Sequence, residues 1–224
     1  MSILKSRWLK IDTEYSKRKI FELISTNTYT KESLAGFIDI NHFENSIEAT
    51  FVEQVTITQN IVDPFGNVTE QHLNIYNHVE FRFIGKDFIE IISPPRSIKS
   101  FTHFLTKTFK HQLFISALKI DLRMVLKKAR ITAQSVIVKK AKVSGLKVGE
   151  KGLASVEIKS VSDALEDLYD FSRGSNYILD KVCGQITIDS EKYEFEVSKL
   201  GYITCDEDLH HLMVDILVAN NNLA

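Results

Sequence analysis

The amino-acid sequence predicts an α+β protein in which antiparallel sheets, built from a meander and hairpins, carry helices packed on one face. Long β-branched stretches alternate apolar and polar residues, other stretches repeat apolar residues at helical spacing, and turn-forming residues separate them. With 44% apolar and 25% charged residues, the 224-residue chain has ordinary globular composition. Few glycines and prolines leave little room for long linkers. We therefore expect two closely packed subdomains, residues 1–120 with the meander and residues 121–224 with a basic helix and strand and an acidic end.

The first 92 residues of the chain are predicted to contain a strand, a helix and a three-stranded meander. The helix is indicated by apolar residues at a spacing of three and four, and the strands by β-branched runs. Turn chemistry at 63–67 and at 85–87 separates the strands of the meander, and alternate residues are expected to line one buried face. The elements are, in order, a strand at 7–11, a helix at 14–25, and strands at 47–58, 68–84 and 88–92.

Two helices are predicted in the middle of the chain. Ser97 is expected to cap a helix at 98–110, which a strand at 113–120 follows. Asp121 is expected to cap the second helix, whose buried stripe has the spacing i, i+3, i+4, i+7. This stripe consists of Leu122, Val125, Leu126 and Ala129, and the cations on the opposite face are Arg123, Lys127 and Arg130.

The remaining residues are predicted to form hairpins, an acidic helix and a closing helix that begins with acids. A β-branched strand at 131–143 is expected to turn at Ser144-Gly145 and to pair with a strand at 154–159. Ser162 is expected to cap a helix that ends near Phe171, with Ala164, Leu165, Leu168 and Tyr169 on its apolar side. A hairpin at 182–188 and 193–197, a short strand at 202–203 and a closing helix at 206–218 complete the chain.

The positive charge of the chain is concentrated in its middle third. The formal net charge is −1, but residues 96–159 contain 15 Lys and Arg against 3 Asp and Glu. Residues 1–95 carry a net charge of −4 and residues 160–224 a net charge of −9. A stretch with a net charge of +12 attracts phosphates if its cations face solvent.

The basic stretch is the candidate nucleic-acid interface. Lysine dominates it, and lysine suits contact with the phosphate backbone better than base readout, which uses bidentate side chains. Binding is therefore expected to be independent of sequence and strongly dependent on salt. The candidate residues are Lys107, Lys110, Arg123, Lys127, Lys128, Arg130, Lys139, Lys140 and Lys142.

Catalytic and metal-binding motifs are weak in this sequence. Neither a phosphate-binding glycine loop nor a nucleophile elbow nor an H-E-x-x-H helix occurs. Glu157 and Lys159 have the E-x-K spacing of many metal-dependent nucleases, but an exposed strand face with a pair of opposite charges explains them better. The acids at 206–208 with the histidines at 210–211 suit a helix N-terminus better than a metal. We expect no catalytic residue, no metal site and no cofactor, and we expect both cysteines to be reduced thiols.

The order of elements resembles the RdgC family of bacterial recombination-associated DNA-binding proteins and, more distantly, the phage exclusion protein RexA. The strand at Trp8-Leu9 with the helix at 14–25 is similar to the family's opening. Residues 88–118 are similar to its strand–helix–strand unit, and residues 163–197 to its closing helix and hairpin. The resemblance covers about half of the chain, which is shorter than typical members. It implies DNA binding, and the family would imply a closed dimeric ring around duplex DNA, but no motif transfers a functional residue.

These patterns predict a non-enzymatic protein that binds duplex DNA through backbone contacts, in recombination control or in a conflict between phage and host. A homodimer or a protein partner is an open alternative, in which the basic and acidic segments pair across an interface. A metal-dependent nuclease is the third. No apolar run is long enough to cross a bilayer, and the first ten residues lack the apolar core of an export signal. We therefore expect no membrane partner and a cytoplasmic location.

Overall fold

The computed structural model describes residues 2–148 and 151–221. Contacts divide the chain into two compact units. The N-unit comprises Leu9–Ser116, and the C-unit comprises the residues up to Trp8 and those from Ala117 onward. Strand β1 (Ile3–Asp12) contributes its first residues to the C-unit and its last to the N-unit. Among the described residues, no helix has the length and apolar character needed to cross a bilayer.

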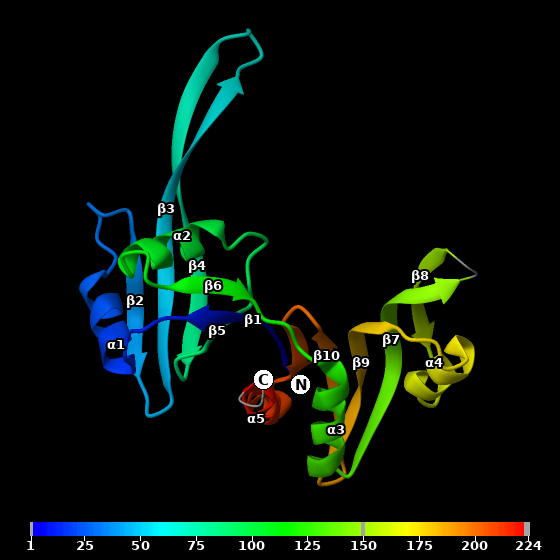
Figure 1. Ribbon diagram of the computed structural model, residues 1–224. Helices are drawn as coiled ribbons and strands as arrows, with labels where there is room; N and C mark the ends of the chain where they lie inside the picture. Colours follow the sequence, from blue (N-terminus) through cyan, green and yellow to red (C-terminus); the bar gives the residue numbers. More distant parts are fainter. Residues whose placement is uncertain (1, 149–150, 222–224) are drawn as a thin grey trace. The chain divides into compact units, whose positions relative to one another are not determined.

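The predicted α+β class is confirmed, since helices accompany sheets whose strand pairs are antiparallel (Figure 1). In the N-unit the strands follow the order β2-β3-β4-β5-β1, and β6 pairs with β1. The elements of the N-unit besides β1 are α1 (Lys17–Thr26), β2 (Ala35–His42), β3 (Ser46–Val62), β4 (Val68–Ile84), β5 (Phe88–Ile92), α2 (Lys99–Thr108) and β6 (Phe114–Ala117).

Phenylalanine rings form the centre of the N-unit core. Phe101 of α2 is fully buried, and its ring centroid lies 4.8 Å from that of Phe81 and 5.8 Å from that of Phe51. Phe37 of β2 contacts Phe51 and Phe81 on the same face of the sheet. Helix α1 adds its two buried residues, Ile20 and Ile24, to the same cluster. The core therefore joins both helices to β2, β3 and β4.

Strand β2 falls in the stretch for which the sequence indicates no element. Its alternation is interrupted where the pairing with β3 shifts between Ile38 and Asn41. Asp39, within this irregularity, has a left-handed backbone with φ of 51°. A bulge adds one residue to a strand, so the side chains before and after it no longer alternate between the two faces of the sheet in step. The alternation of apolar and polar residues that predicts a strand is therefore missing from the sequence of β2, although the strand forms.

The β3–β4 hairpin extends well beyond the rest of the N-unit as a two-stranded arm (Figure 1). The two strands stay in register from Ser46–Ile84 to Val62–Val68. β2 covers the edge of β3 only up to Glu53, and β5 covers the edge of β4 only from Glu80. We name residues 54–77 the arm. The prediction that the meander buries one face is therefore wrong for the arm, where apolar residues such as Ile57, Phe65 and Leu73 are exposed.

Shortening the arm should leave the stability of the protein almost unchanged. Ile57 and Leu73 face each other in register, so residues 58–72 can be replaced by Asn-Gly, which forms a two-residue hairpin turn. The free energy of unfolding should change by less than about 1 kcal/mol, because the removed side chains are exposed. Urea unfolding of the full chain measures this, and a loss of several kcal/mol would contradict the exposed state of the arm.

The C-unit is a sheet in the order β1-β11-β10-β9-β7-β8 with helices against it (Figure 1). Helix α3 contacts β7 and β9, α4 contacts β7 and β8, and α5 contacts α3. The elements besides β1 are α3 (Leu122–Thr132), β7 (Ser135–Val148), β8 (Gly152–Lys159), α4 (Ala164–Ser172), β9 (Ile178–Ile188), β10 (Glu191–Ser198), β11 (Tyr202–Asp206), a 3-10 turn (Glu207–Leu209) and α5 (His210–Asn221).

The turn predicted at Ser144-Gly145 is wrong, because β7 continues to Val148. Val143 pairs with Val156 and Leu146 with Ala154, so β7 contains one more residue than β8 between these pairs. Gly145 supplies the left-handed backbone of this bulge, with φ of 73°. Glycine therefore marks a bulge within the strand and not its end.

Two predicted helix caps lie one residue away from the observed ones. The N-cap of α2 is Ile98, which has no side-chain cap, and the Ser97 hydroxyl lies 3.5 Å from the Lys99 amide. In α4 the cap is Asp163 and not Ser162, since the Asp163 carboxylate accepts a hydrogen bond from the Leu165 amide. Tyr169, predicted on the apolar side of α4, is 67% exposed.

Candidate nucleic-acid interface

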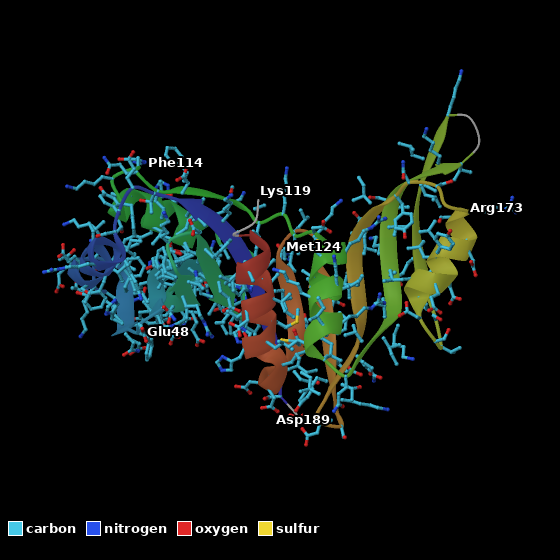
Figure 2. The ribbon with its side chains drawn as sticks, turned by 60° about the horizontal axis from the view of Figure 1, so that its bottom comes forward. Glu48, Phe114, Lys119, Met124, Arg173 and Asp189 are labelled. Carbon is cyan, nitrogen blue, oxygen red and sulfur yellow. The ribbon has the colours of Figure 1, made fainter. Side chains whose placement is uncertain are left out.

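Helix α3 has the two faces that its sequence predicts. The Asp121 carboxylate accepts hydrogen bonds from the Arg123 and Met124 amides, which fixes the start of the helix. The buried residues are the predicted stripe of Leu122, Val125, Leu126 and Ala129. The opposite side, on which Met124 is labelled in Figure 2, faces solvent. We name the cations of this helix the α3 ridge: Arg123, Lys127, Lys128 and Arg130.

The cations of the α3 ridge differ in how far their charge is neutralised. Arg130 lies 3.5 Å from the Asp163 carboxylate, which also caps α4. The Arg123 guanidinium lies over the ring of Tyr177, 4.9 Å from its centroid, and keeps its full charge. Lys127 and Lys128 form no ion pair within the part of the chain that the structure describes. Three of the four cations are therefore available to an anionic partner.

An apolar groove lies between α3 and α4, beside the α3 ridge. Its volume is about 440 Å³. Leu126 and Ile131 of α3, Leu165 of α4 and Leu179 of β9 provide aliphatic surface. We name it the α3–α4 groove, and its lining is Arg123, Leu126, Lys127, Arg130, Ile131, Leu165, Tyr177 and Leu179. The groove combines an apolar floor with three cations of the ridge.

The three predicted lysines of β7 are more neutralised than those of α3. The Lys139 ammonium donates a hydrogen bond to the Val161 carbonyl at 2.8 Å. The Lys140 ammonium lies 3.9 Å from the Glu157 carboxylate of β8. Lys142 is exposed and faces Glu157 across the β7–β8 pair. β7 therefore offers a mixed-charge surface, to which Lys142 contributes the most accessible cation of the three.

Charged groups continue this mixed pattern on β9 and β10. The Lys181 ammonium and the Glu196 carboxylate are 2.6 Å apart, and this hydrogen bond raises the pKa of Lys181. Partial burial acts to raise the pKa of Glu196, but hydrogen bonds from Lys181 and Cys183 outweigh it and lower that pKa. Burial and the contact with Glu196 together raise the pKa of Cys183 to about 11. Cys183 is therefore a neutral thiol near pH 7.

Lys107 and Lys110 belong to the N-unit, whereas the other seven predicted residues belong to the C-unit. The two lysines line a hollow of about 700 Å³ together with polar side chains from the last residue of α1 and the segment after it. Those polar side chains are Thr26, Asn27, Thr28 and Ser33. The predicted interface thus consists of a small cluster on the N-unit and a larger one on the C-unit.

The two sequence patterns that resemble enzyme or metal sites, at 157–159 and at 206–211, do not form a metal-binding arrangement among the described residues. Glu157 and Lys159 share the exposed face of β8, and Glu157 contacts Lys140 there. The Asp206 carboxylate accepts a hydrogen bond from the Glu194 amide at 2.6 Å, a structural role at the end of β11. Across residues 2–148 and 151–221, no three His, Cys, Asp or Glu side chains gather in a way that could hold a metal ion.

The sequence does not reveal the groove beside the α3 ridge. Tyr177 lies in the loop before β9, and Arg123, which it contacts, is on α3. No local pattern connects these positions, because only the packing of α3 and α4 on one sheet brings them together. Compared with known proteins, the chain matches no family model and no curated protein sequence. The resemblance to the RdgC family therefore stays a prediction.

Proposed function

We propose that this protein is a non-enzymatic, cytoplasmic DNA-binding protein that contacts the phosphate backbone through the α3 ridge. The observation that supports this most is helix α3, whose eleven residues contain four cations and no acid, with Arg123, Lys127 and Arg130 exposed. The buried stripe on the other side fixes the direction of this face. Recombination control or a conflict between phage and host is the role that we propose for such binding.

The ridge chemistry favours backbone contact without base readout. Lys127 and Lys128 are point charges without a fixed hydrogen-bonding plane, and Arg123 is occupied on one side by Tyr177. The arm adds no cation, because residues 54–77 contain neither Lys nor Arg. Binding should therefore depend on the number of phosphates that the C-unit reaches and not on their sequence.

A titration of labelled duplex DNA at two salt concentrations tests the proposal. With three to four phosphate contacts, affinity should fall roughly 40- to 150-fold between about 50 and 200 mM salt. Two duplexes of unrelated sequence should bind with equal affinity. Absence of binding at the lower salt concentration would overturn the proposal. Magnesium-dependent cleavage of the strand would instead support a nuclease that uses Glu157 and Lys159.

The ion pair between Arg130 and Asp163 favours a second candidate function. It joins the basic segment of the chain to the acidic one within a single molecule. The same pairing between two copies would make the protein an assembly subunit, alone or with an acidic partner. Light scattering distinguishes this function, since it requires oligomers that dissociate as salt is raised, without affinity for DNA.

A further inference from the structure

The α3–α4 groove has a lining that phosphate binding alone does not explain. Phosphate contact needs exposed cations, but this groove also holds the aliphatic side chains of Leu126, Ile131 and Leu165. Its volume of about 440 Å³ lies within the range of small-molecule sites, roughly 300–1,000 Å³. A ligand that matches this lining has an apolar part, which contacts the aliphatic side chains, and an adjacent negative charge, which contacts the cations.

The charges around the groove restrict where the anionic part of that ligand lies. The α3 wall carries Arg123, Lys127 and Arg130. The α4 side carries Glu166 and Asp170, which line a neighbouring hollow with Arg130 and Leu165. Anionic groups are attracted to α3 and repelled by α4. The anionic part of the ligand therefore lies along α3, and its apolar part enters the groove between α3 and Leu165.

We propose that the α3–α4 groove holds an unpaired nucleobase of the strand whose phosphates the α3 ridge binds. This inference rests on the proposed function of the ridge. Arg123 and Arg130 are separated by about 10 Å along the helix axis, at about 1.5 Å per residue. That length covers two to three phosphates, which are spaced about 3.4 Å apart along a duplex and farther apart in an extended strand. The backbone follows α3 and one base turns into the groove.

The contact between Arg123 and Tyr177 supplies a surface on which a base can stack. Arginine planes and aromatic rings are the side chains that stack unpaired bases in many single-strand sites. Here the guanidinium is held over the ring at 4.9 Å, so the two groups are already ordered before a ligand arrives. In a duplex the bases are paired and stacked on each other, so they do not reach the groove. Single-stranded nucleic acid is therefore the preferred ligand.

The decisive experiment compares three probes with the full-length protein at low salt. The probes are an oligothymidine of about 12 nucleotides, an abasic strand of equal length and charge, and a duplex of equal length. The oligothymidine should bind roughly 10-fold more tightly than the abasic strand, since stacking of one base contributes about 5- to 150-fold. Equal affinity for the oligothymidine and the abasic strand overturns the base site but leaves the ridge intact. Failure of all three probes to bind overturns the ridge itself.

Variants of the groove separate base binding from backbone binding. Leu165→Asn should lower the affinity for oligothymidine to that for the abasic strand, and should leave the affinity for the abasic strand unchanged. Ile131→Asn, at a groove residue that is 77% exposed, should act in the same direction without risk to folding. Ile178→Asn is the matched control, because Ile178 is 55% exposed and does not line the groove. An equal loss in the control and the groove variants contradicts the proposal.

Discussion

Charge reversal at two positions of the α3 ridge should abolish most DNA binding. The variant Arg123→Glu/Lys127→Glu removes two of the proposed phosphate contacts and places two carboxylates at the proposed phosphate positions. Affinity for duplex DNA should fall at least about 100-fold at low salt, because like charges at contact distance disfavour binding strongly. The slope of log affinity against log salt should decrease by about 2, one unit for each lost contact. Both positions are exposed, so the helix stripe that holds α3 is not altered.

The matched control carries the same change in net charge on other surfaces. Lys86→Glu/Lys192→Glu reverses two exposed lysines, one in the turn before β5 and one on β10. The affinity of this control variant for DNA should fall by only a few-fold, because only the long-range electrostatic attraction is reduced. If both double variants lose affinity equally in an anisotropy titration, the overall charge and not the α3 ridge determines binding. Thermal unfolding of both variants verifies that they remain folded.

Helix α3 could be predicted from the sequence because every determinant is local. Asp121 caps the helix through amides two and three residues away, and the buried stripe repeats within the helix itself. When a helix packs on one face, the apolar residues of that face recur at helical spacing in its sequence. The exposed positions of Arg123, Lys127 and Arg130 follow from the stripe, whereas their role as a binding site stays a prediction.

When the burial of a strand depends on which other elements pack against it, the sequence predicts the strand but not how deeply its side chains are buried. Ile57 in the arm and Ile47 in the covered part of β3 have the same residue type on the same strand, yet Ile57 is 45% exposed and Ile47 is fully buried. The difference is that α1, α2 and β2 cover one part of the hairpin, whereas the contacts that the structure describes between the arm and the rest of the N-unit lie at its base, where Tyr29 contacts Gln54 and Tyr76. The α3–α4 groove has the same origin, because its lining comes from α3, α4 and β9.

Truncation of Phe101 should cause a large loss of stability in the N-unit. Phe101→Ala removes a fully buried ring that contacts Phe51 and Phe81. A buried Phe→Ala change costs about 3–5 kcal/mol, and proteins of this kind are stable by only about 5–15 kcal/mol. The close ring pair with Phe81 at 4.8 Å places this site toward the upper end of that range. Urea unfolding of the full chain, followed by far-ultraviolet circular dichroism, measures the loss.

The arm provides a control with identical chemistry. Phe65→Ala also removes a phenyl ring, but Phe65 is 90% exposed at the tip of the β3–β4 hairpin. The free energy of unfolding of the Phe65→Ala variant should differ from that of the unchanged protein by less than about 0.5 kcal/mol. The contrast between the two variants measures what α2 contributes by covering the sheet, because the same atoms are removed on a covered and on an uncovered part of the N-unit. A loss below about 1 kcal/mol for Phe101→Ala would mean that the Phe51–Phe81–Phe101 cluster does not hold α2 to the sheet.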